Sequence, residues 1–350
     1  MSFRLKMLAC ILLASRVACA QDVRIGVLGL FHPHQVMLKA APGQALVIRT
    51  EKRSFVLERS SGKDVAEISV SGDQLIFQMG NQSVRASGII ASSRSHGGAD
   101  FVLDIPGKIS RRYHGVLELK ASSGILVPVV RMDMETAVAS VVQAESAPDT
   151  PIEALKAQAV ATRSYFMASR GRHHDFDFCD TTHCQFLREP PTLESDASRA
   201  TDATRGLVLA YRDQTVAAMF TRSCGGRTRT PQEVGLSSRG YPYFSAVCDY
   251  CQRRPSSWVR HVSTADAADL RQRGETSRLE MDRRLGWDAV PSNNFTVHTD
   301  SKGIVLEGAG EGHGIGLCQA GAKAMAQSGA TFREILDHYY PNTTLVNPAR

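Results

Sequence analysis

The stretch that decides how the middle of this chain folds is ASVVQAESAPDTPIEALKAQAV, from Ala139 to Val160. It predicts the end of one helix, a short turn and the start of a second helix. Asp133 is suited to cap the first helix, and apolar residues follow it at the spacing of a core-facing stripe. The next position on that stripe is Glu145. The apolar residues are Met134, Ala137, Val138, Val141 and Val142.

Glu145 is the residue of this stretch that physical reasoning singles out. A glutamate on an apolar face costs stability unless a partner compensates its charge. The negative end of the helix dipole and partial burial both favour the neutral acid, so we expect a raised pKa. A carboxyl group that titrates near neutrality is suited to general acid–base catalysis. The alternative is an ordinary solvated residue at a helix end, and these arguments leave both open.

The second helix has a clear start and two cations on one face. Thr150-Pro151-Ile152-Glu153 predicts an N-cap threonine with a capping box. Lys156 and Arg163 lie seven residues apart, which is about two helical turns. We therefore expect both cations to point toward the joint at Glu145.

Outside this stretch the chain is rich in short strands. Alternating apolar and polar segments from Val23 to about Leu119 predict half-buried strands. Helical periodicity begins near Asp133, and a second group of short strands covers Gly206–Gly308. Two helices are expected at about Ala320–Gln327 and Thr331–Tyr339. The sequence therefore predicts a strand-rich α+β fold with a central helix pair and C-terminal helices.

The first 20 residues have the features of a secretory signal peptide. Arg4 and Lys6 precede an apolar run, and Ala18-Cys19-Ala20 forms an A-x-A cleavage site. The remaining chain divides into a β-rich N-terminal region, residues 21–110, and a larger domain, residues 111–350, that carries the site. We expect an exported protein that acts in the periplasm, in the cell wall or outside the cell.

Charge and motif content argue against two classes of partner. The formal net charge is +6 and falls to +3 without residues 1–20, because Arg4, Lys6 and Arg16 leave and no acid does. Nucleic-acid-binding proteins usually carry a clustered basic face, which so small an excess does not indicate. The segment GAGEGHGIG (308–316) matches G-x-G-x-x-G in no register, and no G-K-S or G-K-T follows. Neither nucleic acid nor a nucleotide is therefore expected as a partner.

Four segments, in order, resemble the signatures of the SpoIID/LytB family, named for stage II sporulation protein D and the amidase enhancer of bacteria. They are VVQAESAPDTPIEALKAQAVATRSYF (141–166), CDTTHCQ (179–185), AMFTRSCGGRT (218–228) and GHGIGLCQAGAKAMAQSGATFREILDHYYPNT (312–343). The resemblance spans about Arg112 to Val346. The glutamate of the family's V-x-x-E pattern falls on Glu145.

This resemblance implies an activity on peptidoglycan. The family includes lytic transglycosylases that cleave glycan strands without stem peptides to 1,6-anhydro-N-acetylmuramic acid ends. The matching glutamate is their general acid and base. No second carboxylate is required, because the C6 hydroxyl of the sugar attacks C1 in place of water. The resemblance also implies an alternative, a noncatalytic glycan-binding activator of an N-acetylmuramoyl-L-alanine amidase.

We expect further residues to contact the glycan, although each has a structural alternative. Lys156 and Arg163 are expected to position the substrate or its loop. The glycines of SCGGRT either line a groove or form a tight turn, and His313 either faces the cleft or is structural. The expected substrate-binding residues are Lys156, Arg163, Ser223, Gly225, Gly226, His313 and Gln319.

A cluster of cysteine and histidine suggests a metal site. Cys179, His183 and Cys184 lie within six residues, and His173 and His174 precede them. Such a set suits tetrahedral zinc, and some members of the SpoIID/LytB family carry zinc at this segment. We predict a structural zinc bound by the three residues and by either His173 or His174. The alternatives are a Cys179–Cys184 disulfide, free thiols or a nucleophilic cysteine.

The remaining cysteines beyond the signal peptide are Cys224, Cys248, Cys251 and Cys318. Cys248-x-x-Cys251 resembles a redox motif, but Arg253-Arg254-Pro255 follows instead of a helix start. We therefore expect Cys224 to pair with Cys248 or with Cys251.

Overall fold

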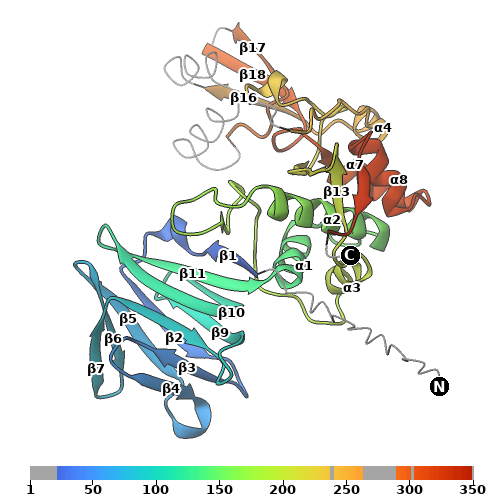
Figure 1. Cartoon of the computed structure of the whole chain (residues 1–350). Helices are drawn as coiled ribbons and strands as arrows, with labels where there is room; N and C mark the ends of the chain where they lie inside the picture. The colour runs from blue at the N-terminus through green and yellow to red at the C-terminus, as the bar shows by residue number, and fades with distance from the viewer. Residues whose placement is uncertain (1–21, 237–239, 263–288, 301–302, 349–350) are drawn as a thin grey trace, which may run out of the picture.

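The computed structural model describes residues 22–236, 240–262, 289–300 and 303–348, so the predicted signal peptide lies outside it. One large curled sheet forms one side of the molecule, and helices with three smaller sheets form the other (Figure 1). This architecture confirms the predicted strand-rich α+β fold. Within the described ranges, the helices lack the combined length and apolar character that a membrane span requires.

The large sheet has 12 strands. They are β1 (Asp22–Gly26), β2 (Gln35–Ala40), β3 (Ala45–Arg49), β4 (Ser54–Glu58), β5 (Val65–Ser71), β6 (Gln74–Met79), β7 (Gln82–Ala86), β8 (Gly88–Ser92), β9 (Ala99–Ile105), β10 (Ile109–Ser122), β11 (Ile125–Asp133) and β12 (Phe178–Cys179). Their order is β12-β1-β11-β10-β9-β2-β5-β6-β7, with β8, β3 and β4 branching from β10. Buried and partly exposed residues alternate along β9, the pattern of a half-buried strand.

Strand β10 ties the sheet together. Its first half, up to Gly115, pairs with β9, and its second half pairs with β11 and β8. A Cβ at Gly115 would lie 2.5 Å from the carbonyl oxygen of Arg131, so only glycine fits where the partner changes. The domain boundary predicted after residue 110 falls inside this strand. The sheet instead continues to Asp133, because the hydrogen bonding of β10 and β11 is uninterrupted there.

The central helix pair consists of α1 (Met134–Glu145) and α2 (Ile152–Ala168). Asp133 caps α1 as predicted, and its carboxylate accepts hydrogen bonds from two backbone N–H groups. The predicted apolar stripe of α1 is buried. The capping box predicted for α2 is wrong. Pro151 is extended (ψ 149°), so the helix begins one residue later, and the Thr150 hydroxyl donates to the Ala147 carbonyl instead.

Helix α2 lies between two hydrophobic cores. Leu155, Ala159 and Phe166 pack with the large sheet and α1, whereas Ala157 and Val160 pack in a second core in the C-terminal half. Figure 1 shows α2 between these two parts. Helix α2 therefore packs against both the large N-terminal sheet and the C-terminal half of the chain.

The C-terminal half contains four further helices among the described residues, and the two terminal helices lie where they were predicted. The helices are α3 (Asp196–Ala203), α4 (Asp249–Arg253), α7 (Gln319–Gln327) and α8 (Phe332–Tyr339). The strands are β13 (Val208–Tyr211), β14 (Gln214–Thr215), β15 (Phe220–Thr221), β16 (Ser257–Val262), β17 (Phe295–Asp300), β18 (Gly303–Ala309), β19 (Leu317–Cys318) and β20 (Thr344–Val346). They form the sheets β14-β13-β20, β15-β19 and β16-β18-β17.

Candidate active site

Glu145 is the last residue of α1 and lies half-buried at the joint with α2. Its Oε1 accepts a hydrogen bond of 3.2 Å from the backbone N–H of Phe186. Its backbone carbonyl accepts one of 3.1 Å from the side-chain amide of Gln319. Two distant segments thus hold this residue, one by its carboxylate and one by its main chain.

Burial raises the pKa of Glu145 to about 7, and it outweighs the opposing effects of the Phe186 amide and the Arg222 charge. The predicted upward direction is confirmed. Among the described residues, these are the groups that shift the pKa of Glu145, and neither is a second carboxylate. The carboxyl group is therefore partly protonated and partly ionised at neutral pH.

The segment that brings Phe186 to Glu145 is anchored on the large sheet. Strand β12 pairs in parallel with β1, which places Cys179 beside Gly26. The carboxylate of Asp180 accepts hydrogen bonds from the backbone of Leu28 (3.2 Å) and from Arg111 (3.0 Å). Both side chains of the Arg111–Asp180 ion pair are largely buried, so this ion pair holds the segment in place against the sheet.

One ligand atom each from His173, Cys179, His183 and Cys184 lie within 4.8 Å of one another. His173 Nε2 is 3.3 Å from Cys184 Sγ, and His183 Nδ1 is 3.6 Å from Cys184 Sγ and 3.7 Å from Cys179 Sγ. Zinc–ligand bonds of about 2.3 Å to sulfur and about 2.0 Å to nitrogen would put tetrahedral S and N ligands about 3.6 Å apart. The donor set fits such an ion. His174 is 96% exposed and pairs with Asp175, so His173 is the histidine that joins this group, which we call the His/Cys cluster.

Arg163 does not meet the expectation that it binds substrate. Its side chain is only 1% exposed, and its guanidinium is paired with the carboxylate of Glu135 at 2.5 Å. It also donates to the carbonyl oxygen of Leu207, 2.9 Å away. The α2 face that carries Arg163 packs against α1 and α3, so the cation is a buried structural group. Lys156 is less buried and pairs with Glu153 on its own helix.

The SCGGRT segment is also committed to internal contacts. Ser223 and Glu311 exchange backbone hydrogen bonds of 3.1 and 2.8 Å, which joins this segment to the glycine-rich loop. Gly225 has a φ of 71°, and a Cβ there would lie 2.6 Å from the carbonyl of Ala309. Ser223 and Gly226 are buried. The tight-turn alternative therefore accounts for Ser223, Gly225 and Gly226, and their predicted contact with glycan is not supported.

Of the residues predicted on the glycine-rich loop and beyond it, Gln319 is the one that touches Glu145. Its amide also donates to Gln158 Oε1 at 3.1 Å. His313 lies in the loop, where its Nδ1 accepts a hydrogen bond of 3.0 Å from the Ile315 backbone. This contact stabilises the loop, in line with the structural alternative for His313.

Sequence reasoning missed three neighbours of this site: the Phe186 amide, Arg222 and Gln158. Arg222 and Gln158 lie inside the motif segments and Phe186 directly follows one, so the motifs were the available signal. A motif does not tell which of its residues point at Glu145. A backbone amide such as that of Phe186 leaves no mark on the sequence at all.

The remaining cysteines form a group of four instead of the predicted pair. Cys224, Cys248, Cys251 and Cys318 are all buried and carry free thiols. The expectation that Cys224 pairs with Cys248 or Cys251 is therefore corrected. Cys318 was missed because it lies 94 residues beyond Cys224 and comes close only through the pairing of β15 with β19.

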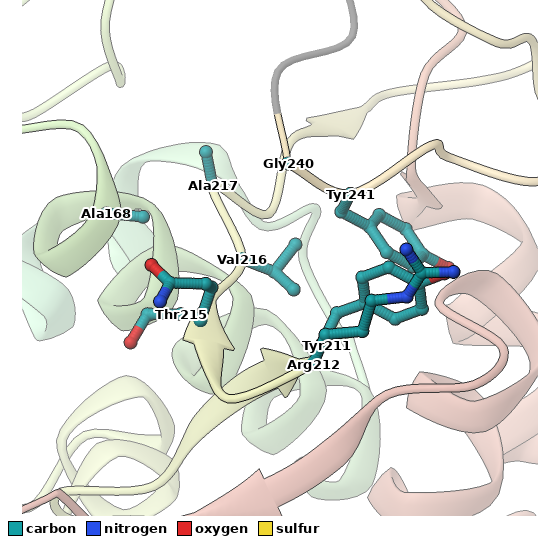
Figure 2. A pocket seen from close by; sticks show the side chains of 9 residues that line it. Ala168, Tyr211, Arg212, Thr215, Val216, Ala217, Gly240 and Tyr241 are labelled. Carbon is teal, nitrogen blue, oxygen red and sulfur yellow. The ribbon is translucent and has the colours of Figure 1, made fainter.

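A pocket of about 240 Å³ lies beside β13 and β14. Figure 2 shows Tyr211, Arg212 and Tyr241 on one side of Val216, with Thr215 on the other. None of the predicted site residues lines this pocket. It is a feature of the second core, separate from Glu145.

The model of the SpoIID family, described as Stage II sporulation protein, matches residues 122–211. An uncharacterized protein of Brachyspira hyodysenteriae is 30% identical over 269 residues, which cover 67% of this chain and 72% of that protein. The chain belongs to the SpoIID/LytB family. The part of this SpoIID/LytB protein that matches the family model includes Glu145 and the His/Cys cluster.

Two relatives in Bacillus subtilis have descriptive names. Stage II sporulation protein D is 26% identical over 290 residues, covering 66% of this chain and 81% of that protein. The amidase enhancer is 26% identical over 276 residues, covering 56% of this chain but only 38% of that protein. The similarity to the amidase enhancer therefore concerns a part of that longer relative.

Proposed function

We propose that this SpoIID/LytB protein is a lytic transglycosylase that cleaves the glycan strands of peptidoglycan, with Glu145 as general acid and base. The observation that carries the proposal is the half-buried carboxyl group of Glu145, whose pKa burial raises to about 7. General acid–base catalysis is most efficient when the pKa of the group lies near the working pH. One carboxyl group with this pKa can therefore serve both as acid and as base.

The proposed reaction has two proton transfers and no net consumption of water. Protonated Glu145 gives its proton to the glycosidic oxygen as that oxygen leaves C1 of N-acetylmuramic acid. The C6 hydroxyl of the same sugar attacks C1, and its proton returns to the Glu145 carboxylate. The products are a free hydroxyl on the released strand and a 1,6-anhydro ring, and Glu145 is again protonated. A second carboxylate would be needed only to form a glycosyl ester or to activate water.

The neighbours of Glu145 support this cycle. The Phe186 amide donates to Oε1 and favours the ionised form that must exist after the first transfer. Arg222 also favours the ionised form, although its own guanidinium is paired with Glu311 at 3.1 Å. Gln319 fixes the main chain from which the carboxyl group projects. These contacts oppose burial without cancelling it, which leaves the pKa near neutrality.

The proposal includes a structural zinc ion held by His173, Cys179, His183 and Cys184. Four protein ligands close a tetrahedral site and leave no position for substrate, which is typical of a structural ion. Phe186 follows Cys184 by two residues, so fixing the cluster also fixes the amide that contacts Glu145. The role we assign to these four residues is to hold that amide in place.

We further propose that the protein is exported, since peptidoglycan lies outside the cytoplasm and residues 1–20 have signal-peptide features. The mature N-terminus is then expected at Gln21. Mass spectrometry of the N-terminal peptide from the native host checks this. A lipid-modified Cys19 at the N-terminus would show a membrane-anchored lipoprotein instead.

The decisive experiment compares Glu145→Gln with the parent protein on purified glycan strands without stem peptides. The substitution keeps size and polarity but removes the transferable proton. We expect release of anhydro-muramic ends to fall by about 10²- to 10⁴-fold, the usual range for loss of general acid–base catalysis. Mass spectrometry of the products measures it. Parental rates in the variant would place catalysis elsewhere.

Glu153→Gln is the matched control. Burial alone would raise the pKa of Glu153. Hydrogen bonds from Lys156 and from the Phe332 amide outweigh burial and lower this pKa below its ordinary value. This carboxylate is thus ionised at neutral pH and has no proton to give. We expect its substitution to leave the cleavage rate within a few-fold of the parent.

The second candidate function is a noncatalytic glycan-binding activator of an amidase. It is favoured by the similarity to the amidase enhancer of Bacillus subtilis. The two candidates separate in one assay. If the parent and Glu145→Gln both stimulate a cell-wall amidase and neither releases anhydro-muramic ends, the activator is the correct function.

A further inference from the structure

We propose that Cys224, Cys248, Cys251 and Cys318 form a second metal site, a buried tetrathiolate that binds one zinc ion. One sulfur from each residue lies within 4.8 Å of the other three. None of the four residues is more than 2% exposed. We call this group the four-cysteine site. It is separate from the His/Cys cluster and lies in the second core, beyond α2.

Three segments of the chain bring the four cysteines together. Cys224 follows β15, and Cys318 ends β19, the strand that pairs in parallel with β15. Cys248 and Cys251 stand at the start of α4 with the C-x-x-C spacing common at structural zinc sites. Helix α7 begins directly after Cys318 and packs against α4. The segments around β15, α4 and β19 therefore place the four sulfurs in one group.

The spacing of the sulfurs suits a shared ion. Four sulfurs about 2.3 Å from one zinc ion lie about 3.8 Å from each other in a tetrahedron. The Cys251 and Cys318 sulfurs are 3.6 Å apart. A disulfide bond would place two sulfurs about 2.05 Å apart and would not require the other two sulfurs to lie nearby.

Hydrogen-bond donors surround the sulfurs. The backbone N–H groups of Cys224 and Gly321 both donate to Cys318 Sγ at 3.4 Å. The Tyr339 hydroxyl donates to Cys248 Sγ at 3.6 Å, and the Ser223 hydroxyl lies 3.5 Å from Cys251 Sγ. Donors of this kind stabilise the negative charge of metal-bound thiolates, and such outer contacts are a regular part of metal sites.

Gly321 shows how closely the outer contacts are packed. A Cβ at this position would collide with the Tyr339 hydroxyl and with Cys248 Sγ. A closed shell of four cysteines leaves no ligand position for water or substrate, so the expected role is structural. Gln319 directly follows Cys318 and contacts Glu145, so the site would also hold the loop that supports Glu145.

Zinc content of the purified mature protein tests the proposal. We expect about two equivalents per chain, one at each site. Cys184→Ser should remove one equivalent and leave an ion whose X-ray absorption spectrum shows four sulfur neighbours. Cys251→Ser should also remove one equivalent but leave an ion with mixed nitrogen and sulfur neighbours. Ser223→Ala, which touches a ligand sulfur without being a ligand, should keep both equivalents.

Two measurements on the unaltered protein keep the test independent of whether a cysteine variant folds. Alkylation without prior reduction should label the four cysteines after unfolding in chelator, as expected for thiols. The proposal is wrong if disulfide-linked peptides join any of the four cysteines. It is also wrong if X-ray absorption of the unaltered protein shows no zinc ion with four sulfur neighbours, or if the metal bound there is not zinc. None of these outcomes depends on glycan cleavage, so they leave the proposed enzyme activity to its own assay.

Discussion

The His/Cys cluster and the four-cysteine site are each followed in the chain by a residue that contacts Glu145, but the two groups are built differently. The proposed ligands of the first come from residues 173–184, include an exposed histidine, and precede the amide that contacts the Glu145 carboxylate. The second draws ligands 94 residues apart, is fully buried, and precedes the Gln319 side chain that contacts the Glu145 main chain. The Phe186 contact is placed to tune the acid, and we call it the tuning side of Glu145. The Gln319 contact is placed to position the acid, and we call it the positioning side.

The largest expected effect separates the two groups by stability. Cys318→Ser should lower the melting temperature by about 10 °C or more, because structural zinc contributes several kcal/mol to folding and this site lies inside a core. Cys184→Ser should cost clearly less, because its cluster also includes the exposed His183 and the partly exposed His173 and Cys179. Calorimetry of both variants checks the order. Equal losses would show that both groups contribute equally to the stability of the fold.

A similar contrast between buried and exposed groups can be tested on α2. Arg163→Leu leaves Glu135 without its buried partner and should cost about 3–5 kcal/mol of unfolding free energy. Lys156→Ala is the matched control two turns away, and its more exposed ion pair should be worth about 0–1 kcal/mol. Denaturant titration measures both. A small loss for Arg163→Leu together with a large rise in KM would restore the substrate role that the structure does not support.

The difference between what was and was not predictable follows the range of the interactions. The Asp133 cap, the apolar stripe of α1 and the place of Glu145 on it are properties of neighbouring residues, and sequence spacing contains them. The partner of Arg163 is not a property of neighbouring residues. Periodicity gives the helix face on which a cation lies, but it does not show what packs against that face. The missed ligand Cys318 shows the same limit, since only the pairing of two distant strands brings it near Cys224.

The pKa of Glu145 predicts a pH-dependent stability difference. The folded protein keeps this proton up to about pH 7, whereas the unfolded chain releases it near its ordinary value of 4.5. Protonation therefore contributes stability that is full below about pH 4.5 and is lost as the pH rises through 7. Glu145→Gln stays neutral throughout, so its melting temperature should gain on the parent between pH 4 and pH 8.

Melting temperatures of the pair at about pH 4 and about pH 8 measure this gain, and Glu153→Gln controls for general effects of pH. Because the pKa of Glu153 is lowered, loss of its charge should make that variant fall behind the parent as the pH rises. The signs of the two changes are opposite. A Glu145→Gln variant that lost stability equally at both pH values would contradict a raised pKa.

The smallest effect concerns Gln319, the contact on the positioning side. Gln319→Ala removes the hydrogen bonds to the Glu145 carbonyl and to Gln158 Oε1, and should lower kcat by roughly 10-fold, about the worth of one such bond. The pH at which activity falls should stay in place, because the amide touches the main chain and not the carboxyl group. Gln327→Ala, on the exposed end of α7, controls for the helix itself. If the pH profile of Gln319→Ala moved instead, Gln319 would tune the acid as the Phe186 amide does, and the division between the two sides of Glu145 would not hold.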